Sequence, residues 1–391
     1  MSRINNRRAV TSLMFGRLIY AVNWYNFAAV FTLVARDMNQ NVSGLGAAVG
    51  SFYLGVALFQ IPGGLLAAKI GPQRTSVYGT VLASTAAMLT SITTNFSQLL
   101  ALRFFVGTGM AFVFAPAVIL MTRYFRQRAE GFSVGLFNAG FYLGGAFGIF
   151  AWAVLADAWG WRESLAISGG VGLFTAVLML LLVPRDTLRE DFTMKTPEIR
   201  KILTSRWLVL LGVGMFGVNG LSSLVTAFMV FYLQSSQNAS AALAGGVGAL
   251  ALIGPQISSP LFGMLHDRIG NPYWVMFLCG LAAIAGLELA SIPFVSAAIL
   301  ASLIVGFAVG GAVTVGFSAA RELAHAEYEV LAVSSINSSG LFAGFFFPII
   351  FSWTVLSFGY SSAWLLSGLY MTPFIAAILL TKSKSFTRLT N

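Results

Sequence analysis

One basic residue, Arg103, lies well inside a long apolar stretch of the sequence. Placing a guanidinium there within a membrane costs at least about 2.5–3.5 kcal/mol, so the side chain should face the protein interior and have a partner. No acidic residue lies inside the first six apolar stretches to pair with it. The partner is therefore a backbone carbonyl, an Asn or Tyr side chain, water or an anionic ligand. A structural role and a ligand-binding role both stay open for Arg103.

The other polar side chains within the apolar stretches are mostly neutral. They can form hydrogen bonds either between packed helices or with a small polar molecule in a cavity. The residues of this kind are Tyr20, Asn23, Trp24, Asn26, Tyr53, Gln60, Asn138, Tyr142, Asn219, Ser222, Ser223, Thr226, Gln256, Asn337 and Ser338.

Acids, histidines and the single cysteine are too scattered to form a reaction centre. Glu288 is the only acid clearly within an apolar stretch, and we expect it near the membrane interface. His266 and His325 fall in polar connections, and Cys279 lies alone in an apolar run. No nucleophile–base set, metal-ligand cluster or Gly-x-x-x-x-Gly-Lys-Ser/Thr phosphate loop is present. We therefore expect no catalytic residue, no metal and no cofactor, which argues against an enzyme.

The elements that carry these residues are predicted to be membrane-spanning helices. Hydrophobic residues make up 57% of the chain and charged residues 9%, with a mean hydropathy of +0.82. Continuous apolar runs of about 20 residues match the thickness of a bilayer crossed as a helix. The sequence predicts an all-α polytopic membrane protein with twelve spans, at 13–35, 45–67, 75–94, 98–121, 130–156, 163–183, 207–233, 241–265, 273–292, 295–319, 329–356 and 361–381.

The distribution of Lys and Arg predicts the orientation. With both termini cytoplasmic, twenty basic residues fall on the inner side, Arg17 among them, and only Arg36 and Arg162 on the outer side. This positive-inside bias explains the net charge of +10 without nucleic acid. The long polar connection suggests three parts: a bundle at 1–184, a cytoplasmic linker at 185–206, and a second bundle at 207–391 that ends in a short cytoplasmic tail.

The two halves repeat at an offset of 199 residues. The glycine-bounded turn from Gly64 to Arg74 reappears from Gly263 to Pro272, and the turn around Gly160 reappears around Gly359. Other glycines pair at the same offset, such as Gly107 with Gly306. Parallel six-helix repeats are typical of secondary transporters, which bind their substrate near the middle of the membrane.

On these residues the chain resembles the major facilitator superfamily over nearly its whole length. The family's loop Gly-x-Leu-x-Asp-Arg-x-Gly is matched throughout by the second turn, whereas Ala68 replaces the acid in the first. The family's Arg-x-x-x-Gly-x-Gly pattern appears at Arg103. The resemblance implies that a cavity is lined by the mid-depth residues, of which we expect Tyr20, Asn23, Arg103, Tyr142 and Asn219 to bind the substrate.

The resemblance also implies a conformational switch at the two turns. An acidic side chain there would cap the N-terminus of a neighbouring helix and favour the outward-open state, a contact that we call the latch. Asp267 would face the start of the helix near Ala129 and Glu130, and Ala68 leaves its own turn without this contact. Asp267 and Arg268 can also be read as ordinary interfacial charges. The switch residues are Gly64, Gly71, Arg74, Asp267, Arg268 and Gly270.

The sequence therefore predicts a secondary transporter, expected to be a monomer in the cytoplasmic membrane that works by alternating access. Its substrate is a small polar organic solute, with an organic anion as the first hypothesis because Arg103 lacks a nearby acid. The alternatives are efflux of neutral or amphiphilic compounds and a non-transporting sensor with the same fold.

Overall fold

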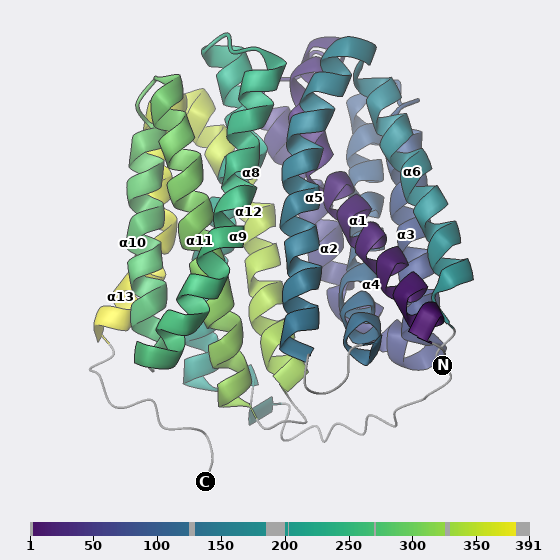
Figure 1. The fold of residues 1–391 in the computed structure, drawn as a ribbon. Coiled ribbons are helices and arrows are strands. Elements are labelled where there is room, and N and C mark those ends of the chain that lie inside the picture. Colours follow the sequence, from purple (N-terminus) through teal and green to yellow (C-terminus); the bar gives the residue numbers. More distant parts are fainter. Residues whose placement is uncertain are drawn as a thin grey trace. The chain divides into compact units, whose positions relative to one another are not determined.

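The computed structural model describes residues 3–124, 130–184, 200–201, 203–269, 271–324 and 329–380. Side chains are described for these residues except 3–7, 68, 122–124, 130–136, 267, 269, 329–330 and 377–380. Every regular element in this part of the chain is a helix (Figure 1), which confirms the all-α prediction. The chain divides into two compact units: Met1–Phe192 with Asn238–Ala249, and Thr193–Gln237 with Leu250–Asn391.

Besides the start of α9 (Ala241–Ile269), the described part of the first unit contains six long helices: α1 (Arg3–Asp37), α2 (Val42–Ile70), α3 (Pro72–Thr90), α4 (Phe96–Tyr124), α5 (Glu130–Trp159) and α6 (Trp161–Leu182). Helix α4 packs against α2 and α3, and α1 packs against α5 and α6. Helix α3 also packs against α6, which closes the bundle. The candidate site lies among these helices.

The second unit contains α8 (Arg206–Ser236), most of α9 (Ala241–Ile269), α10 (Pro272–Ala290), α11 (Val295–Leu323), α12 (Glu329–Ser367), the 3₁₀ turn η3 (Gly368–Met371) and α13 (Thr372–Leu380). Helix α8 packs against α12 and α11, and α10 packs against α11. The single helix predicted over 361–381 is wrong in detail, because η3 interrupts it. Pro373 has no N–H to give to a preceding carbonyl, and the Thr372 hydroxyl donates to the Leu369 carbonyl instead, at 2.7 Å.

The helix bounds repeat along the chain at the offset that the sequence predicts. Helices α2 and α9 begin at Val42 and Ala241, and α4 and α11 begin at Phe96 and Val295, in each case 199 residues apart. Helices α3 and α10 instead begin at Pro72 and Pro272, 200 residues apart. The turn before α10 is therefore one residue longer than the turn before α3.

The connections repeat in backbone conformation as well. Asn39 and Asn238 both have a φ of 52°, in the left-handed region that Asn tolerates better than most residues. Gly160 (φ 96°) separates α5 from α6, and Gly359 (φ 80°) breaks α12 at the equivalent point. Gly71 ends α2 at a φ of 93°, which a side chain would strain.

Close helix crossings depend on glycine at matching positions. A Cβ atom on Gly107 of α4 would run into the backbone carbonyl of Phe52 on α2. In the second unit, a Cβ on Gly306 of α11 would run into the carbonyl of Ala251 on α9, which is the equivalent residue. Glycine therefore sets the approach of these two helix pairs.

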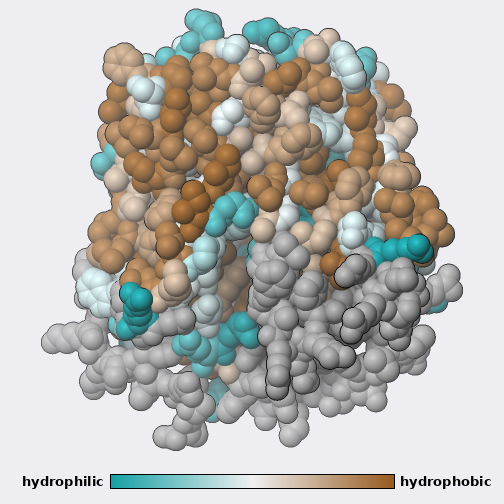
Figure 2. Space-filling view, viewed as in Figure 1, coloured by the Kyte–Doolittle hydropathy of each residue, from teal (hydrophilic) through white to brown (hydrophobic). Residues whose placement is uncertain are grey.

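The surface is apolar enough to lie in a membrane. Hydrophobic side chains cover most of the visible described face (Figure 2), and large ones such as Ile92 and Leu181 are strongly exposed. Ten helices in the described part of the chain are long and apolar enough to cross a bilayer. One of the ten, Leu331–Ala376, covers most of two predicted spans on either side of Gly359. The Ser- and Thr-rich α3 is not among the ten. A multi-pass membrane protein is thus confirmed, whereas the number of twelve spans stays a prediction.

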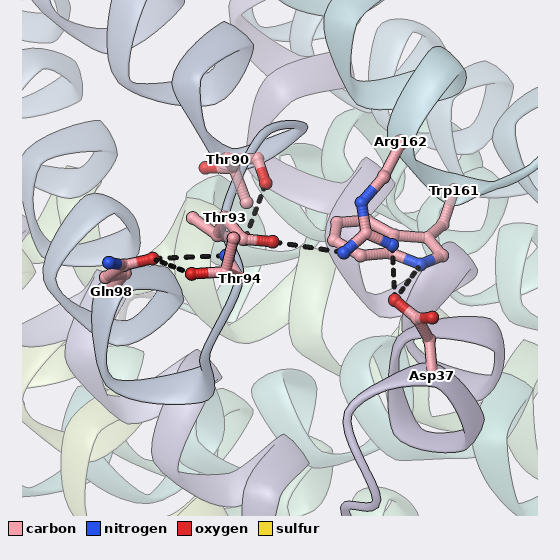
Figure 3. Close-up of polar contacts among 7 residues, drawn as sticks. All are labelled: Asp37, Thr90, Thr93, Thr94, Gln98, Trp161 and Arg162. Atoms are coloured by element: carbon pink, nitrogen blue, oxygen red, sulfur yellow. Dashed lines mark hydrogen bonds and ion pairs between the residues drawn. The ribbon is translucent and has the colours of Figure 1, made fainter.

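Polar contacts fasten one end of the first unit, where α1 ends and α6 begins. Asp37 Oδ2 forms an ion pair with Arg162 and accepts a hydrogen bond from Trp161 Nε1 at 3.3 Å (Figure 3). Arg162 also donates to the Thr93 carbonyl at 3.0 Å. We call Asp37, Thr93, Trp161 and Arg162 the end clamp, since they join α1, the α3–α4 connection and α6.

Candidate functional site

The candidate site starts from one face of α1. Arg17, Tyr20 and Trp24 are spaced three and four residues apart, so they lie on the same side of the helix. Arg17 is only 4% exposed. Counting it among the inner-face charges was wrong, because its side chain points into the helix bundle of the first unit. Its spacing from Tyr20 and Trp24 is the sequence signal that identifies it.

Aromatic rings surround the Arg17 guanidinium. The Cζ atom lies 4.4 Å from the ring centroid of Phe141, 4.5 Å from Phe137, 4.9 Å from Tyr20 and 5.1 Å from Phe114. The Nε atom donates to the Phe137 carbonyl at 3.4 Å. Among the described residues, no hydrogen-bond acceptor pairs with the buried Nη1 atom. The rings stabilise the cation through their faces, and one charged donor is left buried without a partner among the described residues.

Further rings continue from this cage and form what we call the aromatic cluster: Trp24, Tyr25, Tyr53, Phe141 and Tyr142. Trp24 lies edge-on to Tyr53 and Phe141, with centroids 5.6 and 5.9 Å apart. The Trp24 indole N–H also donates to the Tyr53 hydroxyl at 3.3 Å. The cluster draws on α1, α2 and α5, which fixes its rings relative to one another.

Arg103 occupies a second cage in the same unit. Its Cζ atom lies 4.5 Å from the Phe27 centroid and 4.7 Å from the Phe52 centroid. Both rings are 1% exposed and Arg103 itself is 4% exposed. Its Nε atom is buried without a hydrogen-bond partner in the described part of the chain. The prediction that Arg103 faces the interior is confirmed by its burial.

The two arginines belong to different depths of the bundle. Arg103 and Phe114, which contacts Arg17, are eleven residues apart on α4, or roughly 16 Å along a helix. A continuous series of rings joins the cages, since Phe52 contacts Trp24 and Trp24 contacts Phe141. One small carboxylate therefore cannot bind both guanidinium groups at once.

No ion pair is found for either arginine within the described residues. The acids of the first unit whose side chains are described, Asp37, Asp157 and Glu163, are exposed and lie at helix ends. The local charge of this site is therefore positive, and cation–π contacts of about 0.5–2 kcal/mol each offset only part of the desolvation.

The remaining predicted binding residues lie in different surroundings. Tyr20 and Tyr142 are beside Arg17 and Phe141. Asn23 instead donates to the carbonyls of Ile19 (3.2 Å) and Ser168 (3.4 Å), which places its amide against α6. Asn219, in the second unit, donates to the Met215 carbonyl of its own helix at 3.0 Å. A substrate role for these residues stays a prediction.

The switch residues are only partly described. Gly64 has open space where a side chain would begin, and Arg74 and Arg268 are exposed. Gly270 and the side chains of Ala68 and Asp267 lie outside the described residues, so the latch stays a prediction. Beside them His266 is buried, and its Nε2 atom lies 3.1 Å from Glu322 Oε1. The prediction that His266 falls in a polar connection is wrong, because it lies in the last turn of α9, and no sequence pattern indicates its contact with Glu322.

Comparison with known proteins identifies the family. Residues 13–348 match the sequence pattern of the Major Facilitator Superfamily. This chain belongs to the Major Facilitator Superfamily. The recognition made on the turn and helix motifs is thereby confirmed.

Individual facilitators resemble this one over most of its length. The 4-hydroxybenzoate transporter PcaK of Pseudomonas putida is 25% identical over 88% of this chain and 85% of its own. The probable galactarate/D-glucarate transporter GudP of Escherichia coli K12 is 23% identical over 68% of this chain and 67% of its own. A solved bacterial homologue of the human lysosomal transporter Spinster has the same fold, with a TM-score of 0.78 and 15% identity over 97% of this chain and 96% of that one. This facilitator is thus a membrane transporter and not an enzyme.

Proposed function

We propose that this facilitator is a secondary transporter that moves a small organic anion across the cytoplasmic membrane. The observation that carries the proposal is the pair of buried arginines in the first unit, Arg17 and Arg103, for which the described residues supply no carboxylate. A cation kept inside an apolar bundle needs a compensating function, and binding an anion is the simplest one.

Arg17 is the better placed of the two to bind the substrate. Its unpartnered Nη1 atom is a terminal donor of the guanidinium fork, which pairs well with a carboxylate. For Arg103 the buried atom without a partner is Nε, and its guanidinium lies against two fully buried rings. We assign anion binding to Arg17 with Tyr20 and Tyr142 beside it, and we keep Arg103 as a second basic position toward the other end of the bundle.

Two similar transporters are named for substrates that carry carboxylates. 4-Hydroxybenzoate has one carboxylate, and galactarate and D-glucarate have two. These names belong to those proteins, and they support the class of small organic anions for this one.

The transport cycle and orientation follow from the family and the charge distribution. We infer alternating access by two six-helix halves, with the linker at 185–206 between them and both termini cytoplasmic, because the basic residues outside the spans fall almost entirely on one side. The protein would act as a monomer driven by a solute or ion gradient.

Uptake into vesicles tests the proposal. Purified protein in proteoliposomes is assayed with a panel of labelled organic anions for the wild type and for Arg17→Gln, Arg103→Gln and Arg36→Gln. We expect Arg17→Gln to abolish or strongly reduce uptake, because it removes the charge that pairs with the anion. Arg36 is an exposed arginine on the same helix and serves as the matched control. Full anion uptake by Arg17→Gln would refute the assignment, and binding without uptake would indicate a sensor.

A further inference from the structure

The two arginine cages differ in how much aromatic surface they leave uncovered. Phe27 and Phe52, around Arg103, are completely buried. The rings of the aromatic cluster beside Arg17 are instead half-buried. The cage around Arg17 therefore includes a ring that a ligand can contact, Phe141, whereas both rings around Arg103 are covered.

Phe141 lies at the centre of this surface. Its centroid is 5.6 Å from Tyr25, 5.7 Å from Tyr142, 5.9 Å from Trp24 and 6.0 Å from Tyr20. Its ring stands at 85° to Trp24 and at 51–63° to the tyrosines. Rings held at such angles present both faces and edges, and a further ring can pack on them in the offset or edge-to-face arrangements that aromatic pairs prefer.

We propose that the transported anion is an aromatic carboxylate, whose ring packs against Phe141, Tyr25 and Tyr142 while Arg17 binds the carboxylate. This inference rests on the proposed organic-anion transport and adds the substrate class. The carboxylate and the ring of such a ligand must be adjacent, because the Arg17 guanidinium lies only 4.4 Å from the Phe141 centroid. Benzoate-like and phenylacetate-like acids have that form.

The matched comparison is between an aromatic acid and its saturated counterpart. An apolar site without aromatic contacts should bind a flat ring and a cyclohexane ring of similar size with similar affinity. A site that contacts the ligand through aromatic rings should bind the flat ring more tightly, by about 2- to 10-fold in Kd for each aromatic pair. The probes are benzoate with cyclohexanecarboxylate, 4-hydroxybenzoate with 4-hydroxycyclohexanecarboxylate, and phenylacetate with cyclohexylacetate.

Binding is measured on the full-length protein in detergent by calorimetry and by the shift in unfolding temperature, since a ligand of the folded state raises apparent stability. We expect the aromatic member of at least one pair to bind about 2- to 10-fold more tightly. The substitution Phe141→Leu should bring that ratio close to one, because it removes the central ring and keeps an apolar side chain. Phe147→Leu, on the same helix at a residue 61% exposed and outside the cluster, should keep the wild-type ratio.

Tyr25→Leu provides a second test within the cluster, with the same expected loss of preference, if Phe141→Leu does not give folded protein. Equal or weaker binding of the aromatic member in all three pairs would overturn the aromatic assignment while organic-anion transport stands. Failure of every organic anion, aromatic or not, to bind or be taken up would overturn both proposals.

Discussion

The two buried arginines of the first unit, Arg17 and Arg103, lie among aromatic rings that differ in how far they are exposed. Arg103 is enclosed by the buried rings of Phe27 and Phe52, and Arg17 borders on half-buried rings. This difference is the reason that we propose anion recognition for Arg17 and keep Arg103 as a second basic position. Asn23 and Asn26, three residues apart on α1, turn toward α6 and fasten the two helices through Ser168.

The contact between Asn26 and Ser168 should contribute measurably to stability. Asn26 Nδ2 donates to Ser168 Oγ at 2.9 Å, and both residues are buried. We expect a double-mutant cycle with Asn26→Ala and Ser168→Ala to give a coupling energy of about 0.5–1.5 kcal/mol, the range for hydrogen bonds between membrane helices. Reversible unfolding in mixed detergent measures it.

A matched cycle combines Asn26→Ala with Thr175→Val. Thr175 is also buried on α6, but its hydroxyl donates to the Val171 carbonyl of its own helix. These two changes should be additive. Equal coupling in both cycles would show that the Asn26–Ser168 contact has no specific energy.

Helices of the first unit are held by two kinds of contact, polar at their ends and steric at their crossings. The end clamp joins the end of α1 to the start of α6 through side chains that are partly exposed. The α2–α4 crossing relies on the absence of a side chain at Gly107. The first kind is weak and sensitive to salt, and the second is independent of salt.

The substitution Asp37→Asn should lower stability by a small amount. The side chains of Asp37 and Arg162 are 44% and 37% exposed, so the pair is screened and worth about 0–1 kcal/mol. We expect the unfolding temperature to fall slightly at low salt, with less difference from wild type in 1 M salt. Thermal unfolding at the two salt concentrations checks this, and a loss that is large and independent of salt would contradict it.

The substitution Gly107→Ala should separate α2 from α4. The new Cβ would overlap the Phe52 carbonyl, and overpacking of this kind typically costs about 1–3 kcal/mol. Because Phe52 also contacts Arg103, we expect weaker anion binding together with a lower unfolding temperature. Gly64→Ala is the control, since nothing lies within 4 Å of the position where its Cβ would be. If Gly64→Ala destabilises the protein as much, close approach at Gly107 is not the cause.

At the scale of the whole molecule, the two sequence repeats share their helix arrangement but differ in the residues at the candidate site. Helix bounds and turn conformations agree between the two sequence repeats, as Asn39 and Asn238 show. The Arg103 position is instead occupied by Ser302 in the second unit, and the Arg17 position by Phe216. The repeat conserves the geometry, while the basic, aromatic-lined site belongs to the first unit alone among the residues described.

The unequal turns predict an unequal conformational balance. We expect Ala68→Asp to shift the population toward the outward-open state, because a carboxylate at a helix N-terminus is worth about 0.3–1 kcal/mol, and up to about 2 when partly buried. Asp267→Asn should shift it inward. Distance distributions between spin labels on the cytoplasmic ends of the halves measure both shifts. Unchanged distributions in both variants would refute the latch.

Sequence alone determined the class and plan of this protein. We could recognise the spans, the duplication and the family motif from the length of apolar runs, from glycine at turns and from a fixed offset in the sequence. None of these properties depends on how the helices pack. The break after Ser367 is the exception in the fold, because the Thr372–Pro373 signal lies within a run that is apolar throughout.

The site depended on the tertiary structure. Arg103 was found from the sequence because a charge in the middle of an apolar run is costly wherever it lies. Arg17 was not, because it lies close to the start of a span, where snorkelling to the surface is equally consistent with the sequence. Only the packing of α1 against α5 places its guanidinium among Phe137 and Phe141, 120 or more residues away in the chain. The neighbouring helices decide which way a side chain points at a helix end, and the amino-acid composition does not show which helices are neighbours.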